Sequence, residues 1–482
     1  MLKTALLIFS GHAFSSLLLL MRNLLVARLI SVEDYGIAAT FAISMAIVEM
    51  MTTLGLHQMI IQDKDGDDPH LQAGLQGFHL LRSLFTGAAL FILAHPIAKF
   101  IGVDDIAWAY QLLAMIPVFN GLTHFDIHRQ QRHMIYLPSL LTSAIPAFIS
   151  LAMVWPLWSL YGDSRVMLYA IIAQSGLMVV TSHLVAKRRY RLTLERSVIA
   201  RALRFGWPLL INNILLFLIF QGEKIIVGRT LGMEALAIFA MGFTLTLTPS
   251  LLLAGSTQTF FLPQLSAAKE DRARFDTLAR VTFQSHLFFG GLFVIGAMLF
   301  SDPIVHLLLS AKYASLIPLM TLLAILQGLR LFRGGNSTVA LAMGKTGIAA
   351  ISNLPRVFSM PIAWFAAIQT QNIYVVLWIA ITGEVIGFVI SLVLLRRQLG
   401  PSLRLVSAPF WLTMLLVVTA GIQGWLTHSA VSSTPVSVSV WTSLPTLVFF
   451  TLSLISMKDL QLYVFERKKV VLHSEPEDTG SA

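Results

Sequence analysis

The chain has 482 residues, of which 56% are hydrophobic and 12% are charged, and its formal net charge is +10. Soluble domains contain roughly 25% charged residues, so this composition excludes an ordinary soluble protein and indicates an integral membrane protein. The absence of cysteine excludes disulfides and thiolate metal sites. The basic residues gather in selected loops, and we therefore interpret the positive charge as a topology signal rather than as a sign of nucleic-acid binding.

Six membrane-spanning helices are predicted in an N-terminal lobe, residues 1–186, because apolar runs of about 18 residues or more alternate there with short polar loops. The first run carries Arg22 and Asn23 and lacks a small-residue cleavage site, so it predicts a retained helix rather than a signal peptide. The predicted spans are residues 6–27, 36–57, 78–100, 107–124, 137–157 and 166–186.

A basic cytoplasmic connector, residues 187–206, precedes a second predicted six-helix lobe, residues 207–400. Two additional helices follow in residues 401–458, and the polar segment 459–482 predicts a disordered cytoplasmic tail. The fold class is therefore all-α, a polytopic membrane protein with about fourteen transmembrane helices. The remaining predicted spans are residues 207–228, 234–257, 281–300, 316–341, 347–368, 373–395, 408–426 and 437–457.

An internal repeat relates the two lobes. The stretch "VARLISVEDYGIAA" begins at Val26, and "VGRTLGMEALAIFA" begins at Val227, so matched residues lie about 201 positions apart. Six helices separate the copies, which predicts two parallel bundles with a substrate site at their interface and transport by rocking of one bundle against the other. In the first copy, Ser31 and Asp34 have the spacing of a capping box that starts the second helix.

The distribution of lysine and arginine predicts that both termini are cytoplasmic. The loops on that side then contain the cluster at residues 187–204 and further cations, among them Arg333. The outer loops contain only Arg28, Lys99, Arg165, Arg229 and Lys312. We therefore expect a multi-pass protein of the bacterial cytoplasmic membrane with an N-in, C-in orientation.

Charged residues inside the apolar runs are the candidate site, because each costs on the order of 2.5–3.5 kcal/mol at the centre of a membrane helix. Arginine suits bidentate contact with phosphate, so the cations predict a cavity wall for an anionic group. The acids predict either proton coupling or ion pairing, and the alternative for every charge is a structural pair such as Arg22 with Glu49. The candidates are the cations Arg22, Arg82, Lys224 and Arg356, the acids Glu49, Glu223 and Glu384, and the polar residues His12, Asn23 and Asn213.

The histidines are scattered apart from "HFDIHRQQRH", residues 124–133. His124, Asp126 and His128 could imitate a metal site, but we interpret this stretch as a cytoplasmic loop and expect no metal. The sequence contains no P-loop, no nucleotide-binding glycine pattern and no nucleophile elbow. We therefore expect no cofactor and no enzymatic activity.

The stretches "RNLLVARLISVEDYGIAATF", "GLHQMIIQ" and "EKIIVGRTLG", together with two helices beyond a twelve-helix repeat, resemble a known family. This family is the Wzx-type polysaccharide and O-antigen flippases, in the superfamily that also contains multidrug exporters and the lipid II flippase. The resemblance implies flipping of an undecaprenyl-pyrophosphate-linked oligosaccharide to the outer leaflet for lipopolysaccharide or exopolysaccharide synthesis. It also implies cavity cations at Arg22, Lys224 and Arg356, and partnership with membrane lipids, a polysaccharide polymerase and chain-length proteins.

Two alternatives stay open. A multidrug or small-cation exporter should prefer acidic cavity residues, whereas Arg22, Arg82 and Arg356 are basic. A membrane glycan polymerase or ligase needs a large outer loop, whereas the predicted outer loops have only about 5 to 15 residues. Transport is expected to use a proton or sodium gradient, and the sequence does not identify the glycan.

Overall fold

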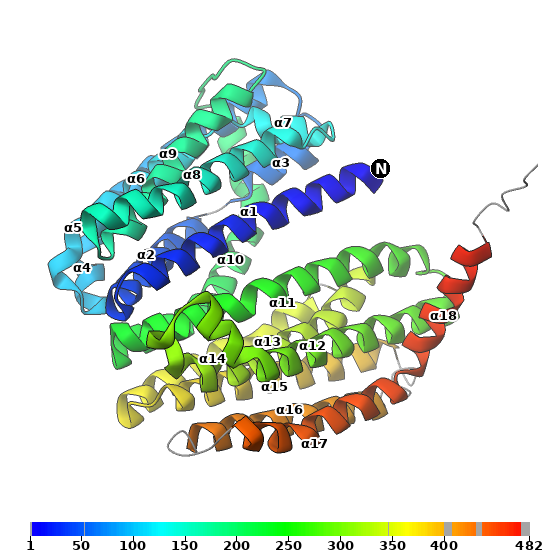
Figure 1. Ribbon diagram of the computed structural model, residues 1–482. Coiled ribbons are helices and arrows are strands. Elements are labelled where there is room, and N and C mark those ends of the chain that lie inside the picture. The colour runs from blue at the N-terminus through cyan, green and yellow to red at the C-terminus, as the bar shows by residue number, and fades with distance from the viewer. Residues whose placement is uncertain (1, 53, 346, 400–406, 430–435, 474–482) are drawn as a thin grey trace, which may run out of the picture. The chain divides into compact units, whose positions relative to one another are not determined.

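The computed structural model describes residues 2–52, 54–345, 347–399, 407–429 and 436–473, and in these ranges it contains helices and no strand. Mostly long helices connected by short loops make up each of two compact units (Figure 1). The all-α polytopic fold predicted from the composition is therefore confirmed.

The first compact unit comprises Met1–Met241, His306–Tyr313 and Trp364–Ile373. Within it, α8 packs along both α9 and α1, and α10 packs along α2 and α4 (Figure 1). Its helices are α1 Leu2–Leu29, α2 Val32–Thr52, α3 Leu56–Gln62, α4 Pro69–Ile101, α5 Ala107–Leu113, α6 Met115–Leu122, α7 Asp126–Arg132, α8 Leu137–Tyr161, α9 Arg165–Val185 and α10 Arg196–Leu231.

The second compact unit comprises Gly242–Val305, Ala314–Ala363 and Tyr374–Ala482. In this unit α16 packs against α17 and α13. The helices from α11 onward are α11 Met233–Ala267, α12 Arg272–Leu308, α13 Ile317–Ala342, α14 Gly347–Thr370, α15 Ile373–Leu399, α16 Ser407–Ser429, α17 Val436–Ser456 and α18 Lys458–His473.

Nine helices of the described residues are long and apolar enough to cross a membrane, or up to eleven if two bent pairs are each one span. Every predicted span overlaps a helix, although residues 107–124 contain the two helices α5 and α6 and the span 36–57 extends past the end of α2 to the start of α3. The total of fourteen spans and the lobe boundaries stay predictions. Apolar helices without a large soluble domain show a multi-pass membrane protein.

Three local assignments differ from the sequence prediction. Residues 126–132, predicted as a loop, form the short helix α7, and α10 already begins at Arg196 within the predicted connector. Residues 458–473 form α18 where the tail was predicted to be disordered, and residues 474–482 lie outside the described part of the chain. Each of these segments is polar, and hydropathy detects only apolar helices.

The predicted start of α2 is confirmed. The Ser31 hydroxyl accepts a hydrogen bond from the backbone N–H of Asp34 at 3.0 Å and donates one to the Asp34 carboxylate at 2.5 Å. Such a cap satisfies an N–H group that has no partner within the helix. The first copy of the repeat thus forms the turn between α1 and α2.

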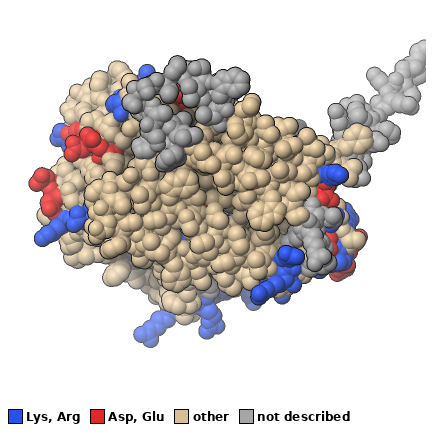
Figure 2. Space-filling view, turned by 90° about the horizontal axis from the view of Figure 1, so that it is seen from below, with Lys and Arg blue, Asp and Glu red and all other residues tan. Residues whose placement is uncertain are grey.

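The face of the protein shown in Figure 2 carries few charges. On this face, uncharged side chains cover most of the area, and the lysine, arginine, aspartate and glutamate side chains gather toward the margins. Large exposed apolar side chains such as Phe85, Ile92 and Leu184 lie on the outer surfaces of helices. This surface is suited to contact with lipid chains rather than with water.

Candidate functional site

Three arginines surround one glutamate in the second compact unit. Glu384 on α15 is completely buried, and its carboxylate pairs with Arg356 Nε at 2.5 Å, Arg333 Nε at 3.0 Å and Arg330 Nε at 3.4 Å. The three arginine side chains are only 6% to 11% exposed. We call these four residues the arginine cluster. The Glu384 carboxylate is thus shared by three guanidinium groups, whose planar forks suit bidentate contact with phosphate.

Neutral acceptors hold the arginines in place around Glu384. Arg333 donates to the side-chain oxygens of Asn353 and Ser352 on α14, the latter at 3.3 Å. Arg330 donates to Gln327, one turn earlier on α13, at 3.2 Å. These acceptors contribute no charge, so they orient the guanidinium groups without reducing the positive charge of the cluster.

Two glycines on either side of the glutamate bring α15 close to α14. In the sequence "GEVIG", Gly383 and Gly387 follow the small-xxx-small pattern of closely packed membrane helices. A Cβ atom on Gly387 would lie 2.5 Å from the Ser352 carbonyl oxygen, and one on Gly383 would lie 2.7 Å from the Ser359 hydroxyl. The close approach of the two backbones is what brings Glu384 within reach of Arg356.

Arg22 forms a second buried cationic site, in the first compact unit. It lies on α1, is 7% exposed, and donates to Gln174 Oε1 on α9 at 2.5 Å and to Ser150 Oγ on α8 at 3.1 Å. It also donates to the neighbouring Asn23 Oδ1 at 3.2 Å. All three of these acceptors are neutral, so these hydrogen bonds leave the guanidinium charge in place.

The other predicted residues are distributed over several helices. Arg82 on α4 has its Nη2 atom 3.0 Å from His79 Nδ1, and Lys224 on α10 donates to Gln221 at 3.2 Å. Each of these contacts joins residues three positions apart on one helix. Glu223 is buried and Asn213 is half-buried on α10. The side chains of His12 and Glu49 lie outside the described residues.

Among the described side chains, the structure joins Arg356 with Glu384 and Arg22 with Asn23. Of the two roles predicted for Glu384, ion pairing is observed, and proton coupling stays a prediction. Binding of substrate by any of the cations also stays a prediction.

Sequence reasoning missed two members of the arginine cluster. Arg330 was not among the candidates, and Arg333, which the charge distribution assigned to a cytoplasmic loop, lies within α13. That assignment is wrong, and it also conflicts with the predicted span 316–341, which contains Arg333. Gln327, Arg330 and Arg333 recur every three residues, and this spacing on one helix face is the signal that would have found them.

The stretch at residues 124–133 has a structural role. Asp126 is completely buried and accepts hydrogen bonds from Arg129 Nε at 2.6 Å, Gln130 Nε2 at 3.1 Å and the backbone N–H of Lys187 at 2.8 Å. Among the described side chains, no group of three His, Asp or Glu is arranged to hold a metal ion. Asp126 therefore serves to anchor the connector.

Comparison with known proteins identifies the family. Residues 25–318, more than half of the chain, match the model of the family described as "Polysaccharide biosynthesis protein". The chain belongs to this family. It is 21% identical to the lipopolysaccharide biosynthesis protein WzxC of Escherichia coli (strain K12), over 82% of this chain and 81% of that one. It is also 20% identical to the succinoglycan biosynthesis transport protein ExoT of Rhizobium meliloti (strain 1021), over 63% and 62% of the two chains.

The fold of this polysaccharide biosynthesis protein is similar to that of a solved membrane transporter. The inward closed conformation of the lipid II flippase MurJ matches with a TM-score of 0.69 and 15% identity, over 96% of this chain and 100% of that one. At this level of identity the likeness concerns the fold.

Proposed function

We propose that this polysaccharide biosynthesis protein flips a lipid-linked oligosaccharide repeat unit from the cytoplasmic to the outer leaflet by alternating access. The observation that carries the proposal is the arginine cluster, in which three buried guanidinium groups share the Glu384 carboxylate within a membrane protein. Membership of the family and the names of WzxC and ExoT support a polysaccharide precursor as the cargo.

The chemistry of the cargo matches the cations. An oligosaccharide is bound to its undecaprenyl carrier through a pyrophosphate, and this group carries the negative charge of the molecule. Planar guanidinium forks bind phosphate oxygens bidentately, and a surrounding of low dielectric constant strengthens such contacts. Arg330, Arg333 and Arg356 are therefore proposed to bind the pyrophosphate, and Arg22 is proposed as a separate contact in the first compact unit.

In this proposal the protein is a transporter that catalyses no reaction. It lies in the cytoplasmic membrane, and both of its termini are in the cytoplasm. A proton or sodium gradient is proposed as the energy source, and a polymerase and chain-length proteins are proposed to take over the product. Flipping breaks no covalent bond, so it requires no nucleophile, metal or cofactor.

Flipping is tested by measuring lipid-linked oligosaccharide at the outer leaflet in cells that lack the protein and carry variants of it. Arg333→Ala and Arg356→Ala should each reduce the outer-leaflet signal by about tenfold or more, the effect of losing one charge-assisted hydrogen bond to the cargo. Arg165→Ala is the matched control, because Arg165 pairs with Asp163 2.7 Å away at a half-exposed position. Wild-type export in both cluster variants at normal abundance would refute the proposed site.

Two further measurements separate this function from the alternatives. A multidrug exporter would change drug susceptibility on deletion and leave the surface glycan intact, whereas the proposed flippase would lose the glycan. A polymerase would elongate lipid-linked units in vitro as a purified protein, and that result would overturn the proposal.

A further inference from the structure

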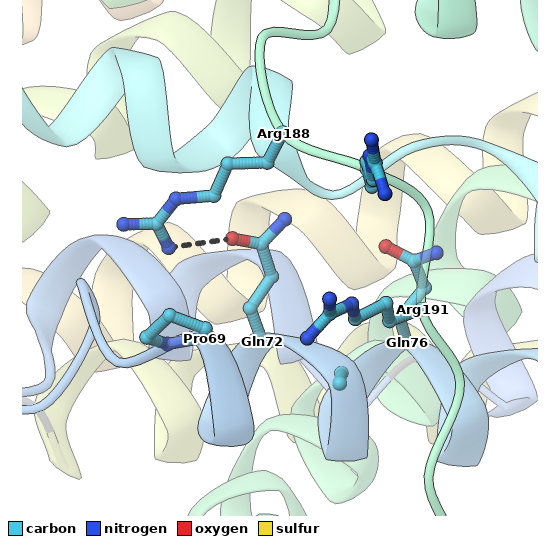
Figure 3. Close-up of a pocket in the computed structure, with 7 residues that line it drawn as sticks. Pro69, Gln72, Gln76, Arg188 and Arg191 are labelled. Atoms are coloured by element: carbon cyan, nitrogen blue, oxygen red, sulfur yellow. Dashed lines mark hydrogen bonds between the residues drawn. The ribbon is translucent and has the colours of Figure 1, made fainter.

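Another basic site lies in the first compact unit, between α4 and the connector. A pocket of about 230 Å³ lies between α4 and the connector, and it is lined by Pro69, Gln72, Ala73, Gln76, Arg188, Arg189 and Arg191. Figure 3 shows Arg188 and Arg191 extending from the connector toward the glutamines of α4.

Every polar side chain that lines this pocket can donate a hydrogen bond, and none is a carboxylate. Three are guanidinium groups, and none of these forms an ion pair with a described carboxylate. Arg188 donates to the oxygen of Gln72 at 3.1 Å, which leaves the Gln72 amide NH₂ as a donor (Figure 3). A pocket of donors with an excess of positive charge selects an anion.

The glutamine deeper in the pocket also points to a ligand. Gln76 is 1% exposed, and its Oε1 atom accepts a hydrogen bond from the backbone N–H of Phe125 at 3.3 Å. Its Nε2 atom is buried beside the Tyr190 hydroxyl, and within the described part of the chain neither group completes a hydrogen bond of good geometry. A buried amide NH₂ group in that state costs free energy, and an anion oxygen in the pocket would satisfy it.

The connector is held firmly over α4, so the pocket is built before a ligand arrives. The backbone N–H of Thr193 donates to the Ala73 carbonyl at 3.1 Å, and His124 Nε2 lies 3.0 Å from the Arg188 carbonyl oxygen. A Cβ atom on Gly77 would overlap the Thr193 carbonyl, so only glycine permits this close approach. A fixed backbone reduces the entropy lost when the arginines bind.

We propose that this pocket binds a phosphate group on the predicted cytoplasmic side of the membrane. Its volume is smaller than the roughly 300–1,000 Å³ of pockets that enclose whole small molecules, so it suits one phosphate or diphosphate group rather than a glycan repeat. The phosphate belongs either to the headgroup of an anionic lipid or to a free anion. This site is independent of the proposed flipping, and it couples the connector to α4 when occupied.

Binding is measured with the purified full-length protein. Thermal unfolding is followed by tryptophan fluorescence with inorganic phosphate, with pyrophosphate, and in nanodiscs of phosphatidylglycerol or of phosphatidylcholine. Stabilisation by phosphate or pyrophosphate identifies a free anion as the ligand. Stabilisation only by phosphatidylglycerol, relative to phosphatidylcholine, identifies a lipid headgroup.

The decisive comparison uses two double variants of equal charge. Arg188→Gln/Arg191→Gln should weaken binding by about tenfold or more, because both guanidinium groups line the pocket. Arg196→Gln/Arg204→Gln removes the same charge from residues outside the lining and should change binding by less than about twofold. The melting temperature without ligand and the elution volume verify that each variant is folded.

Equal losses in the two double variants would overturn the proposal, because they would show general attraction to a basic surface. An absence of stabilisation by all three phosphate-containing probes would overturn it as well. Gln76→Leu supplies an independent check, since it removes the buried donor and should weaken binding without changing the charge. The readout is binding alone, so failure of this proposal leaves the proposed flipping untouched.

Discussion

The arginine cluster and the Arg22 site show two ways of holding a guanidinium group inside a membrane protein. In the cluster, three arginines are packed around the buried Glu384 carboxylate. Arg22 instead rests on the neutral oxygens of Gln174, Ser150 and Asn23. One isolated cation can be held by dipoles, whereas three adjacent cations repel each other and need an opposite charge among them.

The two sites differ in whether a carboxylate holds the arginine side chains in place. Glu384 is required to bring the three arginines together, because its carboxylate pairs with all three. The Arg22 site has no carboxylate among its three hydrogen-bond acceptors, so its charge is undiminished by them. We therefore expect the largest stability effects at Glu384 and smaller ones at the acceptors of Arg22.

The largest effect is expected for Glu384→Gln. The variant leaves three buried guanidinium groups without their shared carboxylate, and loss of one partner of a buried ion pair costs about 3–5 kcal/mol. The free energy of unfolding in mixed micelles, from titration with a denaturing detergent, measures this cost. Asp163→Asn, at the half-exposed pair with Arg165, is the control and should cost about 1 kcal/mol or less.

A double variant distinguishes charge from packing at the same position. Glu384→Gln/Arg356→Gln removes one of the repelling cations and should recover part of the stability that Glu384→Gln loses. If the double variant is as unstable as the single one, then side-chain packing rather than charge holds the cluster together.

A smaller effect is expected for Gln174→Leu in the Arg22 site. The change removes the acceptor at 2.5 Å from a guanidinium that is 7% exposed. A hydrogen bond to a charged group contributes about 1.5–3 kcal/mol, and the same unfolding measurement should show a loss of this size. Gln174→Glu is the matched variant, because it keeps the acceptor and adds a charge, and it should unfold no more easily than the wild type. If Gln174→Leu lowers the free energy of unfolding as much as Glu384→Gln does, the two sites do not differ in the way proposed.

Part of the arginine cluster could be predicted from the hydropathy of the sequence. Hydropathy located the apolar helices because lipid contact requires long apolar runs, and it identified Arg356 and Glu384 because charges inside such runs are costly. Arg330 and Arg333 also lie inside the predicted span 316–341, so the same criterion could have found them, but Arg333 was counted among the loop cations. The pairing itself depends on Gly387, whose close contact with Ser352 belongs to the packing of two helices.

The Arg22 site was predictable only in part. Arg22 and Asn23 were identified because they interrupt the first apolar run. Ser150 and Gln174 come from helices more than a hundred residues later, and each is one of several uncharged polar residues in a mainly apolar helix. Such residues are common in membrane helices, so only the fold reveals that these two meet Arg22.

A third prediction concerns the helix contact that builds the cluster. Gly387→Ala places a Cβ atom 2.5 Å from the Ser352 carbonyl oxygen and should push α15 away from α14. Overpacking of this kind costs about 1–3 kcal/mol, and it should also separate Glu384 from Arg356. The control is Gly296, which lies in a helix with open space around it. Gly344 is unsuitable as a control, because its φ of 74° would strain any other residue. Gly296→Ala should leave the unfolding free energy nearly unchanged, and an equal loss in both variants would contradict the contact.

The smallest effects are expected from a matched pair of serines, one in each site. Ser150 accepts from Arg22 at 3.1 Å and donates to the Ala170 carbonyl on α9, whereas Ser352 accepts from Arg333 at 3.3 Å and donates within its own helix. Ser150→Ala should cost about 1 kcal/mol, since a guanidinium without a carboxylate among its hydrogen-bond acceptors relies on each neutral oxygen. Ser352→Ala should cost less, because Arg333 retains Glu384 and Asn353. The free energies of unfolding of the two variants, measured in parallel, give the difference. A greater loss of stability for Ser352→Ala would mean that pairing with Glu384 does not make the cluster less dependent on its neutral acceptors.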